Sequence, residues 1–225
     1  MSEDYYMADI ELFSKAVCPY AQRAQMALIE KGLPFRVIEI DTNNKPIWFK
    51  DLSPYGKVPV LRHGDALVYE SRIINEYLDE AFPTPPLLPR PPAARAEARI
   101  WIDYCDTQLL PVMSAFLIDR DNPEKQTKNR EVLSQRFCFI EEEGLRKLSN
   151  GPYWLGDEVS LVDIQFMPMF ERLPCYVEQW DAPTASQFPR LQAWISKMQQ
   201  RPSHQRTARS YDEHIAIIRR LSAAA

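Results

Sequence analysis

Residues 16–25 read AVCPYAQRAQ, and this stretch places a cysteine and a proline at the expected start of a helix. Proline is favoured at the first helical position, because its missing N–H would have no partner there. Cys18 then occupies the N-cap, where its sulfur can accept a hydrogen bond from the amide of Tyr20 or Ala21. The positive end of the helix dipole and this hydrogen bond both favour the thiolate over the thiol. The alternative for Cys18 is a buried packing residue, which is the usual role of a lone cysteine.

The first eighty residues around this motif alternate strand signals with helix signals. Gly32 and Pro34 end the helix that begins at Pro19, and Gly64 with Asp65 supplies a tight turn between two short apolar runs. This order, βαβαββα, predicts a small mixed sheet with a parallel first pair and an antiparallel hairpin. The predicted elements are strands over 10–13, 35–40, 58–61 and 66–69, helices over 19–31 and 73–81, and a short helix after Pro46.

The composition changes abruptly at residues 83–92, PTPPLLPRPP, which hold six of the nineteen prolines of the chain. Such a segment is extended and stiff, and is typical of a linker. Beyond it, apolar residues recur at three- and four-residue spacing, as in helices that pack on one another. We therefore expect an α/β domain over 1–82, a linker over 83–92 and an all-helical domain over 93–225.

Composition and charge exclude several classes of protein. The 225 residues carry a net charge of −4 without a run of lysine and arginine, which argues against a nucleic-acid partner. No apolar stretch reaches the roughly 20 residues of a membrane span, and the acidic N-terminus does not resemble a signal peptide. The four cysteines never form CxxC, and the three histidines lack metal-ligand spacing. These features predict a reduced, cytoplasmic protein with no metal.

Four sequence blocks resemble the glutathione transferase superfamily, in particular its cysteine-type omega and lambda classes. They read CPYAQRAQMAL, NKPIWF, GKVPVL and YESRIINEYLDEAFP, in family order within residues 18–83, and SLVDI and FERL extend the likeness into the helical half. The resemblance implies a thioredoxin-like domain followed by an all-α domain, glutathione as co-substrate and assembly as a homodimer. Residues 70–101 of this sequence also resemble bacterial stringent starvation protein A, a transferase-fold protein that binds RNA polymerase.

The resemblance assigns glutathione to the first domain, with its sulfur beside Cys18. Val58 would pair its backbone with the glutathione peptide in front of a cis-proline, Pro59. Ser71 and the first amides of the following helix would hold the γ-glutamyl carboxylate. Glu70 would pair with the γ-glutamyl ammonium, and Lys45 would contact the glycyl end of glutathione. Tyr20 would add a hydroxyl near the thiol, at a position where omega members of the human type carry phenylalanine.

Each assignment has a structural alternative. Ser71 is also suited to capping a helix, Lys45 to a solvated surface, and Pro59 to an ordinary trans turn. Residues 160–163, SLVD, form a capping box whose role is folding. We expect packing roles for Cys105, Cys138 and Cys175. The aromatic and methionine-rich stretch 166–180 fits either an acceptor pocket or a core.

The sequence thus predicts a glutathione-dependent thiol transferase that acts through a mixed disulfide of Cys18 with glutathione. Its second substrate would be a small electrophilic or oxidised compound, such as dehydroascorbate, a disulfide or a glutathionyl adduct. The alternative is a non-enzymatic transcription partner that binds RNA polymerase. The intact Cys18–Pro19 motif, together with Lys45, Glu70 and Ser71, favours the enzyme.

Overall fold

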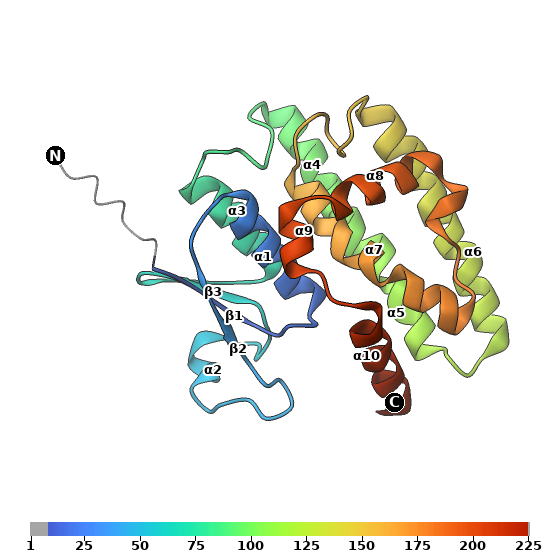
Figure 1. Cartoon of the computed structure of the whole chain (residues 1–225), viewed down its shortest axis with the longest axis horizontal. Coiled ribbons are helices and arrows are strands. Elements are labelled where there is room, and N and C mark those ends of the chain that lie inside the picture. The colour runs from blue at the N-terminus through green and yellow to red at the C-terminus, as the bar shows by residue number, and fades with distance from the viewer. Residues whose placement is uncertain (1–8, 225) are drawn as a thin grey trace. The chain divides into compact units, whose positions relative to one another are not determined.

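The computed structural model describes residues 9–224, and the chain divides into two compact units, residues 1–86 and 87–225. Unit 1 is built on a four-stranded sheet of order β2-β1-β3-β4 (Figure 1). β1 (Ile10–Ser14) pairs in parallel with β2 (Arg36–Glu39) and antiparallel with β3 (Val60–His63), which pairs antiparallel with β4 (Ala66–Tyr69). The predicted strand order and directions are confirmed.

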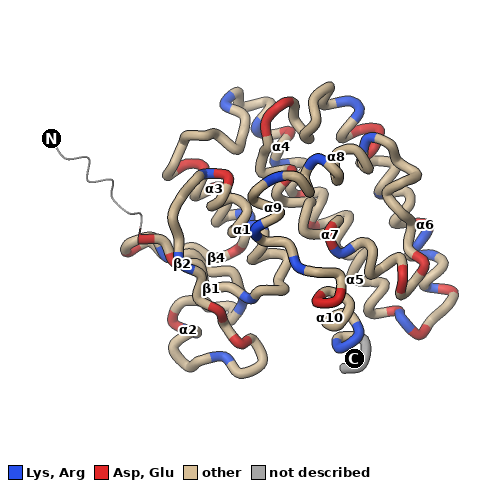
Figure 2. The backbone as a smooth tube through the Cα atoms, in the orientation of Figure 1, with Lys and Arg blue, Asp and Glu red and all other residues tan. Residues whose placement is uncertain are grey.

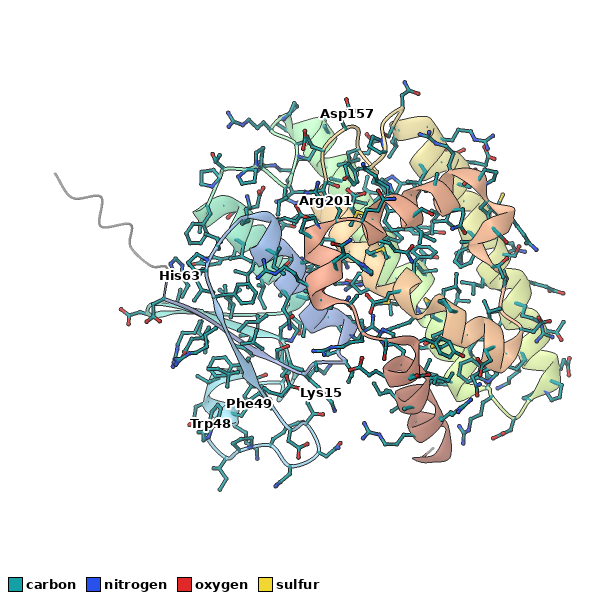
Figure 3. The ribbon with its side chains drawn as sticks, viewed as in Figure 1. Lys15, Trp48, Phe49, His63, Asp157 and Arg201 are labelled. Carbon is teal, nitrogen blue, oxygen red and sulfur yellow. The ribbon has the colours of Figure 1, made fainter. Side chains whose placement is uncertain are left out.

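Helices cover both faces of this sheet. Phe13 of β1 and Val60 of β3 form a buried cluster with Phe49 of α2 (Phe49–Leu52). Figure 3 places Trp48 beside Phe49, and the ring centroid of Trp48 lies 6.0 Å from that of Phe13. Since side chains alternate along a strand, the buried Leu12 faces the opposite side. There the sheet meets α1 (Pro19–Glu30) and α3 (Ser71–Ala81), which pack on each other (Figure 1).

A buried lysine joins the ends of both helices on that face. The Lys31 side chain, which follows α1, is 0% exposed, and its ammonium lies 2.5 Å from the Asp79 carboxylate of α3. It also donates to the carbonyl oxygens of Phe82 and Pro85, at 2.8 and 2.5 Å. A buried ammonium is tolerated only when it is paired and hydrogen-bonded. Lys31 therefore fixes the end of unit 1, including the start of the proline-rich segment.

The described residues of unit 2 form helices joined by loops and contain no strand, apart from one isolated bridge between Tyr153 and Gly156. The all-helical prediction is confirmed, although two π-helical segments, η1 and η2, interrupt the expected long helices. The elements are α4 (Pro92–Tyr104), η1 (Cys105–Leu109), α5 (Leu110–Ile118), α6 (Pro123–Phe139), η2 (Ile140–Arg146), α7 (Leu161–Trp180), the 3₁₀ turn η3 (Ala185–Gln187), α8 (Pro189–Gln199), α9 (Pro202–Thr207) and α10 (Tyr211–Ala224).

Helix α7 is the core of unit 2, since residues 161–170 are all buried. This burial favours the core interpretation for the first part of the aromatic stretch. The predicted capping box is present at the start of α7: the Asp163 carboxylate accepts from the N–H and the hydroxyl of Ser160, at 2.8 and 2.6 Å. It also accepts from Trp154 N and Trp194 Nε1, at 2.9 and 2.7 Å. Burial raises the pKa of Asp163, and the hydrogen bonds oppose this rise.

A second buried carboxylate connects helices α7, α9 and α10. Glu171 of α7 lies 2.9 Å from Nε2 of His204 on α9 and 2.6 Å from Nε2 of His214 on α10. The backbone N–H of Arg209, between the two helices, donates to the same carboxylate at 3.1 Å. All three ionisable side chains are buried. Glu171 therefore fastens the C-terminal segment to the core of unit 2.

Basic and acidic residues are interspersed along the tube of each unit (Figure 2). Among residues 9–224, no helix is long and apolar enough to cross a membrane. The same residues contain no cluster of three histidine, cysteine or acidic side chains that could hold a metal ion.

Candidate functional site

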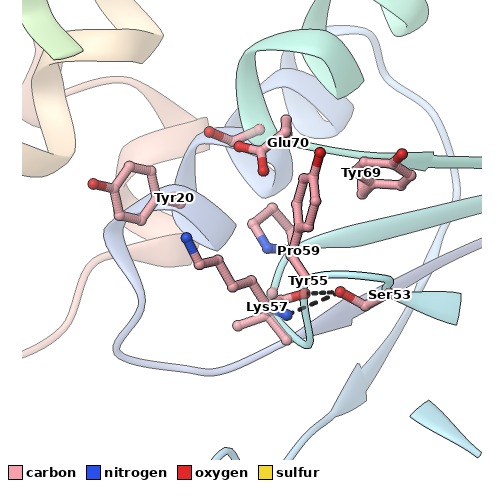
Figure 4. A pocket seen from close by; sticks show the side chains of 9 residues that line it. Tyr20, Ser53, Tyr55, Lys57, Pro59, Tyr69 and Glu70 are labelled. Atoms are coloured by element: carbon pink, nitrogen blue, oxygen red, sulfur yellow. Dashed lines mark hydrogen bonds between the residues drawn. The ribbon is translucent and has the colours of Figure 1, made fainter. Parts of the chain in front are cut away.

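Unit 1 contains a cavity of about 260 Å³ beside the start of α3 (Figure 4). It brings together five of the seven predicted site residues and leaves Cys18 and Lys45 off its lining. Four further residues complete the wall. The lining residues are Tyr20, Ser53, Tyr55, Lys57, Val58, Pro59, Tyr69, Glu70 and Ser71.

Cys18 occupies the predicted N-cap of α1, with Pro19 at the first helical position. Its backbone carbonyl accepts the first helical hydrogen bond from Gln22 N at 3.0 Å. The predicted hydrogen bond from a helix amide to the sulfur is wrong, because Cys18 makes no side-chain capping bond to the described start of α1. Its thiol instead turns toward the cavity wall and donates to the Val58 carbonyl oxygen at 3.9 Å. The thiol thus lies next to a backbone group that lines the cavity.

The loop before β3 forms the part of the cavity wall that the Cys18 thiol contacts. The peptide bond between Val58 and Pro59 is cis, as predicted from the sequence. The buried Ser53 hydroxyl donates to Lys57 O at 2.8 Å and accepts from Lys57 N at 2.9 Å (Figure 4). These two bonds fix the backbone of Lys57, whose ammonium extends to the region between Tyr20 and Glu70 (Figure 4). Lys57 belongs to the GKVPVL block, of which only Val58 and Pro59 were predicted as site residues.

Glu70 and Ser71 form the start of α3, with a correction to the predicted cap. Glu70 is the N-cap, and Ser71 is the first helical residue, 6% exposed. Glu70 has φ +69° and ψ 117°, a backbone conformation that costs a non-glycine residue about 1–3 kcal/mol and that clusters at functional sites. Its carbonyl accepts from Ile74 N at 2.8 Å. The first N–H groups of a helix have no intrahelical partner, so this start can hold an anion.

Lys45 lies outside the cavity, on an exposed loop before α2. Its ammonium nitrogen sits over Gly56, 3.6 Å from the position that a β-carbon there would take. Gly56 has φ +62°, which a side chain would strain, and it directly precedes Lys57. Lys45 therefore approaches the loop that carries the cavity wall without lining it.

Aromatic side chains flank the charged groups of the cavity. Tyr55 and Tyr69 pack edge to face, with ring centroids 5.4 Å apart. Tyr20, 40% exposed, lies under the guanidinium of the fully buried Arg23 at 5.0 Å. Tyr55 and Tyr69 were not predicted, because their separation in sequence carries no spacing signal.

The other cysteines differ from one another in exposure. Cys105 and Cys175 are buried, as expected of packing residues, and burial together with the nearby Glu178 carboxylate raises the pKa of Cys175. The packing role predicted for Cys138 is wrong, since it is exposed on α6. The apolar residues of α6 form too weak a periodic pattern to predict which face of the helix is buried and which is exposed.

Comparisons with known proteins agree with this architecture. Residues 12–86 match a family model described as glutathione S-transferase, N-terminal domain, and residues 100–202 match its C-terminal domain. Glutathione S-transferase omega-1 from Mus musculus is 35% identical over 215 residues, which cover 92% of this chain and 85% of the relative.

Solved structures are similar over nearly the whole chain. Glutathione transferase Omega 3C from Trametes versicolor has a TM-score of 0.83 and 30% identity, over 90% of each chain. A rice glutathione transferase, solved in complex with glutathione, has a TM-score of 0.87 and 28% identity, over 97% of this chain and 98% of that one.

Proposed function

Because the chain belongs to the glutathione S-transferase family, we propose that its unit 1 cavity binds glutathione and that Cys18 transfers thiols to and from it. The cavity offers one carboxylate, one ammonium and a helix start, which suits a zwitterionic peptide. The γ-glutamyl carboxylate would meet Ser71 and the first amides of α3, and its ammonium would meet Glu70. The glutathione backbone would pair with Val58, as an added strand does.

The two lysines of this region take the remaining charge of glutathione. Lys57 extends its ammonium into the cavity, and Lys45 lies on the neighbouring loop over Gly56. We assign Lys57 to the carboxylates of the bound peptide. Lys45 stays the proposed partner of the glycyl end, reached from outside the cavity wall.

The proposed reaction is thiol–disulfide exchange. The Cys18 thiolate attacks the glutathione sulfur of a mixed disulfide, forms a Cys18–glutathione disulfide and releases the substrate as a thiolate. The thiolate of a second glutathione then attacks the same glutathione sulfur, which yields oxidised glutathione and regenerates the Cys18 thiolate. Ala21 stands where a resolving cysteine of a CxxC motif would be, so the second glutathione must resolve the intermediate.

One observation carries this proposal: the thiol of Cys18, at the start of α1, contacts the Val58 carbonyl of the cavity wall. A hydroxyl at this position can only hydrogen-bond the glutathione sulfur, whereas a thiolate can form a covalent bond with it. Helix starts also favour the thiolate form of cysteine. Reduction is therefore favoured over conjugation, and the acceptors are dehydroascorbate, small disulfides or glutathionyl adducts.

Intact mass spectrometry after incubation with oxidised glutathione tests this proposal. We expect one glutathionyl group on Cys18, removed by reduced glutathione, and loss of both the adduct and the reductase activity in Cys18→Ala. Cys138→Ala is the matched control, because this exposed cysteine would acquire any nonspecific adduct. Full reductase activity in Cys18→Ala would disprove the thiol-transfer mechanism.

The quaternary structure and the alternative function have simple tests. We propose a homodimer, which light scattering coupled to size-exclusion chromatography measures directly. A transcription partner without glutathione chemistry would fail to bind glutathione resin, whereas the proposed enzyme is retained and elutes with free glutathione. Failure to bind, together with capture of RNA polymerase, would favour the alternative.

A further inference from the structure

Ser53, the residue that follows α2, bonds through its side chain to both backbone groups of a single residue, Lys57 (Figure 4). It is 2% exposed, and its hydroxyl donates to Lys57 O at 2.8 Å and accepts from Lys57 N at 2.9 Å. A serine hydroxyl has one hydrogen to donate, and the Lys57 carbonyl takes it. Ser53 therefore lines the unit 1 cavity without a donor left for a carboxylate of a bound peptide.

The backbone of Ser53 joins the same turn to the core of the sheet. Ser53 N donates to the carbonyl oxygen of Phe49 at 2.9 Å, and Phe49 belongs to the buried cluster that includes Phe13 and Val60. Ser53 O accepts from Gly56 N at 2.8 Å, which closes the turn from inside. The turn is therefore fixed at its first residue by the core of the sheet and at its last residue by the Ser53 hydroxyl.

Three of the groups that the proposed function assigns to glutathione stand on this turn or beside it. Val58 directly follows Lys57, and its carbonyl accepts from the Cys18 thiol at 3.9 Å. The Lys45 ammonium nitrogen lies over Gly56 of the turn, 3.6 Å from the position that a β-carbon there would take. A shift of the turn would therefore move the backbone of Lys57 and Val58 relative to Cys18 at the start of α1.

We propose that Ser53 is a positioning residue for glutathione, because it holds the backbone of Lys57 and Val58 in the arrangement that the bound peptide needs. This inference rests on the proposed function of the unit 1 cavity. Without the hydroxyl, the N–H and C=O of Lys57 would bond to water, since residue 57 is exposed. The turn would keep its connection to the core but would have to be ordered by the ligand, and ordering a loop on binding costs affinity.

Calorimetric titration of the full chain with reduced glutathione tests this role. We expect Ser53→Ala to raise the Kd for glutathione about tenfold while the chain stays natively folded by circular dichroism. In the reductase assay, the KM for glutathione should rise by a similar factor and kcat should be nearly unchanged, because Cys18 and α1 are untouched. Ser53→Thr keeps the hydroxyl and should retain more of the affinity than Ser53→Ala.

A second serine of unit 1 provides the matched control. Ser14 is 0% exposed, accepts from Gln25 Nε2 at 3.0 Å and does not line the cavity, so Ser14→Ala should leave the Kd for glutathione unchanged. Equal affinity of wild type and a natively folded Ser53→Ala, or a fall in kcat with an unchanged KM, would overturn the role of Ser53 and leave the proposed function standing. Failure of the wild type to bind glutathione would refute the proposed function and this inference with it.

Discussion

The N-termini of α7 and α3 differ in how they are capped and in what lies beside them. At α7, the Asp163 carboxylate accepts from Ser160, Trp154 and Trp194, and the whole network is buried. At α3, Glu70 makes no side-chain cap bond within the described residues and borders a cavity together with Ser71. The start of α7 is capped by side chains of the protein itself, whereas the start of α3 lies beside a cavity.

The difference separates a serine that stabilises the fold from a serine that meets a ligand. A helix start whose donors are hydrogen-bonded by side chains of the protein is stabilised, as the Asp163 network stabilises the start of α7. A helix start with a strained residue, such as Glu70 at α3, lowers stability, and such strain is typical of functional sites. Three sets of substitutions test whether this distinction holds.

The largest effect is expected at Asp163. Asp163→Ala leaves the buried donors of Trp154, Ser160 and Trp194 without an acceptor, which should lower the free energy of unfolding by about 3–5 kcal/mol. Urea denaturation followed by tryptophan fluorescence measures this loss. The folded fraction should keep wild-type affinity for glutathione, because the network lies outside unit 1. A loss below about 1 kcal/mol would mean that the network contributes little to folding.

A pair of serine substitutions gives the next largest effect. Ser71→Ala should raise the dissociation constant of glutathione about tenfold by removing a hydroxyl from the anion site, with little change in stability. Ser160→Ala should lower the free energy of unfolding by about 1–2 kcal/mol and leave glutathione affinity unchanged. Calorimetric titration and urea denaturation of both variants measure the two quantities. The comparison fails if both serines affect the same quantity.

The smallest effect is expected from Glu70→Gly. Glycine adopts φ +69° without strain, and its greater freedom in the unfolded chain offsets part of the gain. We expect the free energy of unfolding to rise by about 0.5–1 kcal/mol while glutathione affinity falls, since the carboxylate is lost. Glu70→Gln retains the strain and is the control for the charge. A Glu70→Gly variant that is less stable than wild type would show that the backbone of Glu70 is not strained.

The sequence predicted features that follow from local chemistry. Pro19 placed the start of α1 correctly, and Gly64 with Asp65 placed the hairpin turn between β3 and β4. The three-residue spacing of Ser160 and Asp163 predicted the capping box at the start of α7. In each case the residues that interact are close in sequence, so a spacing rule contains the information.

Features that depend on residues far apart in sequence were not predicted. Lys57 lines a cavity together with Tyr20 and Glu70, and Lys31 pairs with Asp79 across 48 positions. The direction of the Cys18 thiol is set by Val58, 40 positions away. The positive φ of Glu70 has no signal in sequence, because glutamate rarely adopts it.

The Glu171 carboxylate has a consequence for the order in which the chain folds during its synthesis. Its histidine partners, His204 and His214, follow Glu171 in the chain and therefore leave the ribosome after it. Unit 1 is a continuous stretch of residues 1–86 and can fold while the remainder is still being translated, at about 5–20 residues per second. The core helix of unit 2 gains this contact only after His214 has been synthesised. All the residues that line the unit 1 cavity are therefore synthesised before the histidines that fasten unit 2.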